Sequence, residues 1–310
     1  KMLSDACRKE GIKLFFYYSQ LDWYRDDYFP RGRTGNGITG RGEGDWNDYI
    51  EFMKAQLTEL LTNYGEIGGI WFDGQWDQHE WDGKRFGKLK ADFKLTEVYE
   101  LIHKLQPQAL IGSNHHLSPN PGEDFQMFEK DLPGKGTKDF ATSADDIGNL
   151  PLEVCETING SWGFNLQDRK HKSEKELVQY LVKAAGYGSN LLLNVGPMPN
   201  GKIQDEHIES LKKIGKWVKQ NGQTIYNTKR GPISPSDEIA STQDGNIVYI
   251  HLLDNNKSEY FIEGFKSKFK NISYLDSNKK VSYKKTKTGL HLILDKKEIN
   301  SIDTILIMEL

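Results

Sequence analysis

Short apolar runs recur along the first part of the chain, and loops and segments of helical length separate them. The runs cover residues 12–19, 68–73, 109–114, 152–157 and 190–196. Near-continuous apolar strands that alternate with helices are typical of a parallel sheet whose two faces are covered by helices. The pattern therefore predicts an α/β fold built on five parallel strands.

Helical periodicity is clearest in residues 46–64, where apolar side chains recur at positions i, i+3, i+4 and i+7. A second helix is expected to begin at Ser173, because Ser173 and Glu176 form the Ser-x-x-Glu pattern of a capping box. A third is expected at about 205–220. Residues 1–11 indicate the end of an amphipathic helix and not the charged-then-apolar opening of a signal peptide.

The pattern changes after about Gln223. Short β-rich runs such as "NIVYIHLL", "LHLILD" and "DTILIMEL" follow one another, with turn residues between them. Closely spaced strands of this kind are typical of a small antiparallel β-sandwich. We therefore expect two domains, a catalytic α/β portion at 1–222 and a β-sandwich at 223–310.

Composition narrows the class of partner. The chain has 310 residues, and 41 Lys and Arg against 44 Asp and Glu give a net charge of -3, so no electrostatic feature favours nucleic acid or an anionic membrane. The longest apolar runs, such as "LLLNV", are far shorter than the roughly 20 residues of a membrane span. The two cysteines, Cys7 and Cys155, are expected to be buried thiols and not a disulfide.

Asp73 stands out in "GGIWFDGQW", where it ends an apolar strand. A carboxylate at that position loses water unless something compensates for it. Polar residues also end other strands, among them Tyr18, Asn114, Glu156 and Asn194. In a (β/α) barrel the catalytic groups lie at the carboxyl ends of the strands. This set of residues therefore predicts a site at that end of the sheet.

An acid flanked by tryptophans suits glycoside hydrolysis, in which one carboxylate attacks the anomeric carbon and a second carboxyl group protonates the leaving oxygen. Gly74 is expected to give a ligand close access to the backbone. Candidates for the second carboxyl group lie in the presumed loop "NPGEDFQMFEKDLPG" and are Glu123, Asp124, Glu129 and Asp131.

Five ordered motifs carry a family resemblance: "FYYSQLDW", "WFDG", "TINGSWGF", "HKSEKELVQYLVKAAGYGSNLLLNVGPMPNG" and "GQTIYNTKRGP". With them the chain resembles the α-L-fucosidases of glycoside hydrolase family 29. The resemblance implies a TIM-like (β/α) barrel followed by an antiparallel β-sandwich, a retaining exo-glycosidase activity and no cofactor. It also implies that the nucleophile is the Asp of "WFDG", Asp73.

The resemblance extends to further residues. Glu129 matches the family's general acid best, and Glu123 is the alternative. The mechanism requires that acid to start protonated while Asp73 is ionised, with the two carboxyl groups ~5 to 5.5 Å apart. Tyr18, Trp76 and Trp162 are similar to the family's sugar-contacting aromatics.

Two departures from the family pattern change what is expected. Where many members have Asn-Asp-Arg, this chain has Asn114-His115-His116, so His116 is the candidate for a contact normally made by Arg. A metal site at the adjacent histidines is not expected, because consecutive strand residues point to opposite faces.

The second departure is that five strands leave an eight-stranded barrel three short, and the family's early His-rich segment is not found. An open sheet exposes strand edges and apolar faces. This favours a homo-oligomer or association with the missing amino-terminal segment.

The sequence thus predicts a retaining exo-α-L-fucosidase with fucosylated oligosaccharides or glycoproteins as substrates. The resemblance implies an extracellular or periplasmic location. Two alternatives remain at this stage: a non-catalytic fucose-binding protein or truncated pseudoenzyme, and a retaining glycosidase for a related sugar.

Overall fold

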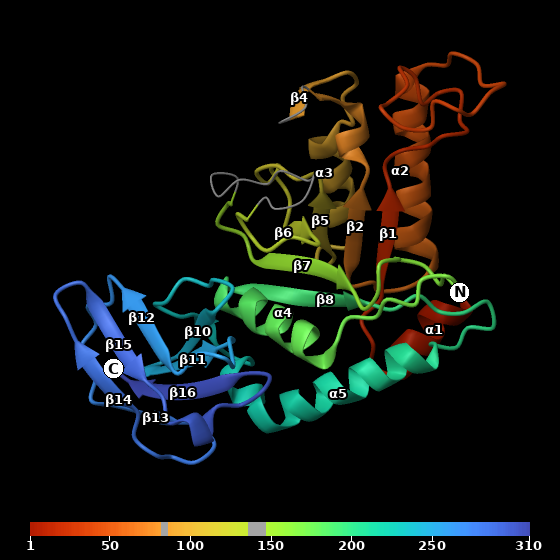
Figure 1. Ribbon diagram of the computed structural model, residues 1–310. Coiled ribbons are helices and arrows are strands. Elements are labelled where there is room, and N and C mark those ends of the chain that lie inside the picture. Colours follow the sequence, from red (N-terminus) through yellow and green to blue (C-terminus); the bar gives the residue numbers. More distant parts are fainter. Residues whose placement is uncertain (82–85, 136–146) are drawn as a thin grey trace. The chain divides into compact units, whose positions relative to one another are not determined.

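The computed structural model describes residues 1–81, 86–135 and 147–310 (Figure 1). The chain forms two compact units, Lys1–Glu153 and Val154–Leu310. The predicted boundary at 222/223 falls inside the second unit. That boundary stays a prediction.

The parallel strands form one six-stranded sheet in the order β1-β2-β5-β6-β7-β8. Their bounds are Phe15–Ser19 for β1, Gly69–Asp73 for β2, Leu110–Asn114 for β5, Phe125–Glu129 for β6, Leu152–Thr157 for β7 and Ser189–Asn194 for β8. This parallel sheet and its helices confirm the prediction of a partial TIM-like barrel. The expected count of five strands was wrong, because β6 lies where the sequence indicated a loop. Among the described residues the parallel sheet therefore has one strand more than the sequence indicated.

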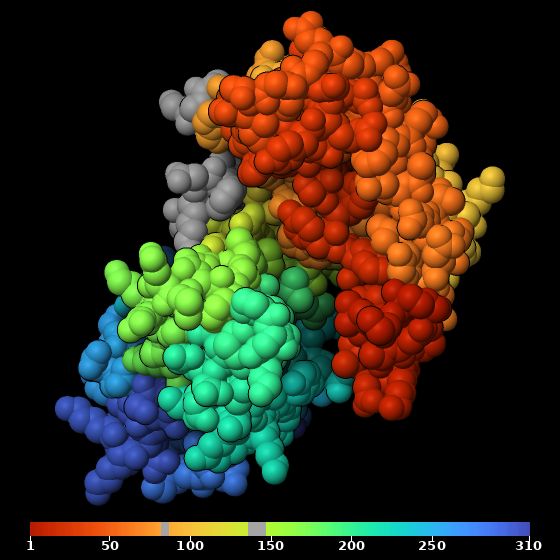
Figure 2. Space-filling model, turned by 90° about the vertical axis from the view of Figure 1, so that its right-hand side faces the viewer, coloured from red at the N-terminus to blue at the C-terminus, as the bar shows by residue number. Residues whose placement is uncertain are grey.

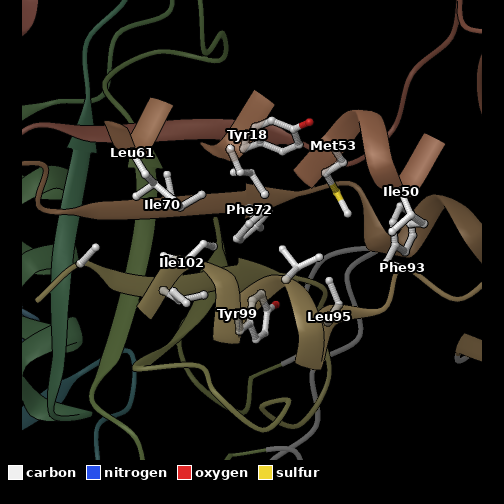
Figure 3. Close-up of a cluster of buried hydrophobic side chains, with 14 of the residues drawn as sticks. Tyr18, Ile50, Met53, Leu61, Ile70, Phe72, Phe93, Leu95, Tyr99 and Ile102 are labelled. Atoms are coloured by element: carbon white, nitrogen blue, oxygen red, sulfur yellow. The ribbon is translucent and has the colours of Figure 1, made fainter. Parts of the chain in front are cut away.

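In the first unit the sheet is covered by helices α2 (Trp46–Asn63) and α3 (Leu95–Leu105), and α1 (Met2–Lys9) precedes it. The predicted helix at 46–64 is confirmed, and Asp45 caps it by accepting a hydrogen bond from the backbone N–H of Asn47. Figure 3 shows Ile70 and Phe72 of β2 between side chains of the two helices. This cluster is the core of the first unit.

The strand period of two fixes which residues face that core. Phe72 is buried in it, so Trp71 and Asp73 point to the opposite face of β2. The register pairs Ser19 with Asp73 and Asp73 with Asn114, so three polar residues lie side by side where β1, β2 and β5 end. The sheet thus brings polar side chains together at the carboxyl ends of its strands, as the sequence predicted.

Residues 20–45 connect β1 to α2 without a helix or a strand of their own. Figure 1 places this segment at the end of the first unit where β1 and β2 stop, and Figure 2 shows its atoms, coloured red-orange, on the surface of that unit. The short hairpin of β3 (His79–Trp81) and β4 (Phe86–Leu89) follows β2. A single turn of 3-10 helix, η1 (Gln75–Gln78), lies between β2 and β3.

The second unit holds two antiparallel sheets, of order β13-β16-β11-β10-β9 and β12-β15-β14, as expected for this part of the chain. Their strands are β9 (Lys229–Arg230), β10 (Ile239–Asp244), β11 (Ile247–Leu252), β12 (Glu259–Glu263), β13 (Asn271–Tyr274), β14 (Ser282–Lys285), β15 (Gly289–Ile293) and β16 (Thr304–Glu309). Apolar side chains from both sheets form one buried cluster. Its members include Val248, Leu292 and Leu306.

Helices α4 (Glu174–Gly186) and α5 (Asp205–Asn221) belong to this same unit. The capping box predicted at Ser173 and Glu176 is present. Val178 and Trp217 pack with Ala240 and Tyr249 of the sheet in a separate buried cluster. That shared core is why these helices group with the antiparallel sheets.

Cys7 and Cys155 form no disulfide. Cys155 is buried as expected, whereas Cys7 is only partly buried because it lies on the short, largely exposed helix α1. Across the described residues, no helix has the length and apolar character that a membrane crossing needs.

Candidate active site

Asp73 lies at the end of β2 and accepts three side-chain hydrogen bonds. The hydroxyl of Tyr17 donates to Oδ2 at 2.8 Å, and the indole N–H of Trp76 donates to Oδ1 at 2.9 Å. The amide of Asn114 also reaches Oδ1, at 3.3 Å. The three donors come from β1, from η1 and from β5, so the strand register and the turn after β2 together fix the orientation of this carboxyl group.

Two opposing effects act on the pKa of Asp73. Burial is the larger and raises the pKa above its ordinary value. The hydrogen bonds from Trp76, Tyr17, the backbone of Gly74 and Asn114 lower it, because they favour the carboxylate. The donors thus partly offset the desolvation of a charge that has little access to water.

Asn114 connects Asp73 to a second carboxyl group. Its side-chain nitrogen donates to Glu129 Oε2 at 2.8 Å as well as to Asp73 Oδ1 at 3.3 Å. The two oxygens can be no farther apart than the sum of these distances, which is shorter than the roughly 6.5–9.5 Å that separates the carboxyl groups of inverting glycosidases. The geometry therefore suits a retaining pair. Glu129 ends strand β6, so it occupies a strand end like Asp73.

Tyr18, predicted to contact the sugar, lies on the face of β1 that points into the core, away from Asp73. Its side chain is buried in the core cluster, and its hydroxyl donates to Gln56 of α2 at 2.8 Å. The structure brings Tyr17 to Asp73 instead. Tyr17 stacks on Trp71 with ring centroids 5.6 Å apart and is 62% exposed. The error is one residue in strand phase, which moves a side chain to the opposite face.

Trp71 lies on the same face of β2 as Asp73 and has a polar partner as well as a stacked ring. Its indole N–H donates to Glu153 of β7 at 3.0 Å. Burial raises the pKa of Glu153, and the bond from Trp71 lowers it. The stacked pair of Tyr17 and Trp71 forms an aromatic wall beside Asp73.

Gly74 has a structural reason to be glycine. Its φ of +107° lies in the left-handed region, and a Cβ there would approach the backbone nitrogen of Leu21 to 3.0 Å. The turn it allows brings Trp76 back over Asp73. Close access of a ligand to the backbone at Gly74 stays a prediction.

The side chain of Glu123, the alternative acid, is buried and hydrogen-bonded. It is buried and accepts hydrogen bonds from Tyr99 at 3.1 Å and from Asn120 at 3.0 Å, and His115 Nε2 lies 3.0 Å from its Oε1. Glu123 is therefore not a solvent-exposed carboxyl group. This carboxyl group is a structural anchor that holds the backbone after β5, which carries Asn114.

His116 is buried with its backbone in the left-handed region, at a φ of +62°. Burial, followed by the nearby His115 and Arg33, lowers the pKa of His116 to about 3. The ring is therefore neutral at neutral pH and cannot supply the positive charge of an Arg. Its role in substrate binding stays a prediction.

The argument that adjacent strand residues point apart does not apply to these histidines, because β5 ends at Asn114. Glu123 engages His115. Within the described parts of the chain, no three His, Cys, Asp or Glu side chains are grouped as metal ligands. Asp124 likewise has structural partners, in His103 and the backbone N–H of Ile111.

The remaining strand-end residues belong to the second unit. Glu156 is buried and pairs with Lys172 at 3.3 Å, so capping is its role. Asn194 donates to the backbone oxygen of Trp162 at 2.8 Å, which ties the loop after β7 to the end of β8. Trp162 keeps an exposed ring, and its contact with a sugar stays a prediction.

Sequence comparison identifies what this arrangement resembles. Residues 1–223 match the family model described as "Alpha-L-fucosidase". The chain is 26% identical over 237 residues to an α-L-fucosidase of Dictyostelium discoideum, covering 73% of this chain and 45% of that protein. It is 26% identical over 259 residues to the tissue α-L-fucosidase of Bos taurus, covering 81% and 49%. The chain thus spans about half the length of the curated relatives it matches.

Solved structures show the same fold. α-L-Fucosidase isoenzyme 1 from Paenibacillus thiaminolyticus superposes with a TM-score of 0.73 at 28% identity, covering 99% of this chain and 74% of that one. The α-fucosidase of Thermotoga maritima, solved in complex with a mechanism-based inhibitor, gives a TM-score of 0.70 at 22% identity, covering 99% and 67%.

Proposed function

Because this chain belongs to the α-L-fucosidase family of glycoside hydrolases, we propose that it hydrolyses terminal α-L-fucose from glycans or glycoconjugates with retention of configuration. The observation that carries the proposal is the bridge made by Asn114. One amide group reaches both Asp73 and Glu129, so the two carboxyl groups face one reaction centre at a separation suited to double displacement.

In the first step a carboxylate oxygen of Asp73 attacks the anomeric carbon, and the bond from that carbon to the aglycone oxygen breaks. Glu129 gives its proton to the departing oxygen. In the second step Glu129, now a carboxylate, takes a proton from water, and the water oxygen attacks the same carbon. Fucose leaves, Asp73 is again a carboxylate and Glu129 is again protonated. The reaction needs no cofactor.

The remaining contacts support these roles. Tyr17, Trp76 and Asn114 hold the Asp73 carboxylate in one orientation, which reduces the reorganisation needed at the moment of attack. Tyr17 stays protonated as a donor, because partial desolvation of this 62% exposed side chain and the neighbouring Asp73 raise its pKa. The stacked rings of Tyr17 and Trp71 offer an apolar surface of the kind that a deoxy sugar's methyl group prefers.

Fucosylated oligosaccharides and glycoproteins are the substrates that this proposal implies. Family resemblance also supports their encounter with the enzyme outside the cytoplasm.

The test is release of nitrophenol from an aryl α-L-fucoside by this 310-residue chain, beside its Asp73→Ala variant and an aryl β-galactoside. Turnover of the fucoside alone, abolished in Asp73→Ala, supports the proposal. No turnover by the folded chain, combined with measurable binding of fucose, would point instead to a fucose-binding protein without catalysis.

A further inference from the structure

The segment 20–45 has no regular secondary structure, but side-chain hydrogen bonds to its backbone cross-link it. Two arginine side chains within the segment donate hydrogen bonds to its backbone carbonyls. Arg31 donates to the carbonyl of Tyr28 at 2.7 Å and to that of Gly42 at 2.5 Å, and Arg41 donates to the carbonyls of Trp23 and Gly35 at 2.5 and 2.8 Å. Long segments of this kind are uncommon in compact domains and are often functional.

Asp77 fastens this segment to the turn that follows Asp73. The Asp77 carboxylate is fully buried and accepts hydrogen bonds from Tyr28 Oη at 2.9 Å and from the backbone N–H and hydroxyl of Thr34 at 2.8 and 2.6 Å. At Gly32 a Cβ would overlap this carboxylate, which explains the glycine. At the other end, the backbone N–H of Gln20 donates to the carbonyl of Asp73 itself.

Three tryptophans surround the two residues Arg33 and Thr34. The guanidinium of Arg33 lies 5.5 Å from the ring centroid of Trp76 and 5.8 Å from that of Trp81, and it donates twice to the carbonyl of Trp76. The indole of Trp23 donates to the Thr34 hydroxyl at 3.0 Å. Trp76 is the same residue that bonds Asp73, so the cluster is continuous with the catalytic carboxylate.

Several rings of this cluster face solvent. Trp23 is 44% exposed and its neighbour Tyr24 is 76% exposed, while Trp81 is 37% exposed. Exposed aromatic rings on a well-fixed backbone are costly to leave in water but lose little entropy on binding. Trp23 is further fixed from behind, because Gly35 packs so closely on its ring that a Cβ would fall 2.4 Å from it.

We propose that Trp23, Tyr24 and Trp81 form an aromatic platform that binds the pyranose ring next to the scissile bond, on the aglycone side of the substrate. A pyranose has an apolar face of C–H groups that stacks on aromatic rings, and hydroxyls at its rim that bond to water or polar side chains. The platform deepens the proposed function and rests on it: the preferred substrate is a fucosylated oligosaccharide and not a simple fucoside.

The test compares two substrates that share fucose and differ in the aglycone. α-L-Fucosyl fluoride has a single-atom leaving group with nothing to stack, whereas trisaccharides in which fucose is α-linked to galactose or to N-acetylglucosamine place a pyranose on the platform. For the trisaccharide that the wild-type chain cleaves fastest, kcat/KM should fall about tenfold in Trp23→Ala and severalfold in Tyr24→Ala, chiefly through KM. The fluoride should be cleaved within twofold of the wild-type rate.

A second variant and a matched control separate loss of the platform from a disturbance of folding. Tyr24→Ala removes a ring with no packing role, so it tests the platform even if loss of the Trp23 bond to Thr34 disturbs folding. The matched control is Tyr226→Ala, which removes an exposed ring from the second unit. It should leave kcat/KM unchanged for both substrates. Equal losses on fluoride and trisaccharide, or no loss on either, would overturn the platform.

Failure of the proposed function would look different. If the wild-type chain cleaves neither substrate, the platform is tested by saturation-transfer NMR with N-acetyllactosamine, which contains no fucose. Signals from its ring protons that disappear in the Trp23→Ala/Tyr24→Ala double variant support the platform without any catalysis. Absence of such signals with the wild-type chain, or signals unchanged in the double variant, would reject it.

Discussion

The hydroxyl of Tyr17 donates a hydrogen bond to Oδ2 of Asp73 across 2.8 Å, from the strand next to β2. This bond favours the ionised carboxylate and so works against the burial that raises the pKa of Asp73. It gives Tyr17 a role in keeping Asp73, the proposed nucleophile, charged near neutral pH.

Tyr17→Phe should therefore raise the pKa of Asp73 and move the acidic limb of the kcat/KM profile to higher pH. At the pH optimum the loss should be about tenfold, because a hydrogen bond to a charged group is removed. Tyr18→Phe is the matched control. It breaks only the bond to Gln56 and should leave the pH profile unchanged. An acidic limb that stays in place in Tyr17→Phe would contradict this role.

Asn114 is expected to matter to both carboxyl groups at once. Asn114→Ala removes the shared donor, so kcat/KM should fall by about 10²-fold or more and both limbs of the pH profile should move. Asn114→Asp keeps the shape but places a third carboxyl group between the other two, and should lower activity further at neutral pH. A pH–rate profile of Asn114→Ala with unchanged limbs would show that the bridge is not functional.

Substitution of Glu129 should affect catalysis, whereas substitution of Glu123 should affect the free energy of unfolding. Glu129→Gln should abolish hydrolysis of substrates with poor leaving groups and change the free energy of unfolding little. Glu123→Gln weakens a buried set of bonds to His115, Tyr99 and Asn120, so it should lower the free energy of unfolding by roughly 1–3 kcal/mol while the folded fraction stays active. Urea unfolding and turnover of both variants check this. The reverse pattern would make Glu123 the acid.

Asp73 should also reduce stability near neutral pH. Its folded-state pKa lies above its unfolded value, so its contribution to stability is fully present below the unfolded pKa and is lost as pH rises through the folded pKa. Asp73→Asn removes a charge that desolvation disfavours and should make the chain more stable than wild type at pH 7. Below about pH 4 the difference should vanish. Chemical unfolding at both pH values measures it. An Asn variant that is less stable at pH 7 would contradict the prediction.

Asp77 should be a determinant of the order of residues 20–45. Asp77→Ala leaves the buried hydroxyl of Tyr28 and the N–H of Thr34 without their acceptor, and should lower the free energy of unfolding by roughly 3 kcal/mol. Limited proteolysis should then cut within 20–45 at a protease concentration that leaves the wild-type chain intact. Proteolysis that is unchanged would show that the arginines alone hold the segment.

The comparison of Tyr17 with Tyr18 shows where the sequence was insufficient. The strand "FFYYS" has no alternation of apolar and polar residues, so its phase cannot be read from the pattern. Only its pairing with β2, where Trp71 and Asp73 share a face, reveals that Tyr17 is the residue beside Asp73. The sequence was sufficient to single out Asp73, because its motif is distinctive.

Strand β6 shows a second limit. "FQMFE" is a short run between turn residues, and it pairs with β5 through long-range contacts that no local pattern reveals. The burial of Glu123 has the same origin, since its partners His115 and Tyr99 come from other elements. By contrast, the helix at 46–64 and the capping box at Ser173 depend on nearby residues and were predicted correctly.

Covalent trapping shows directly whether Asp73 attacks the anomeric carbon. The 310-residue chain is incubated with 2-deoxy-2-fluoro-α-L-fucosyl fluoride, whose fluorine slows the second step, and is then analysed by mass spectrometry of the intact protein and its peptides. We expect one fluorofucosyl group per chain, carried by Asp73 and missing in Asp73→Asn. A label on any other residue, or none on a folded chain that hydrolyses fucosides, would contradict it.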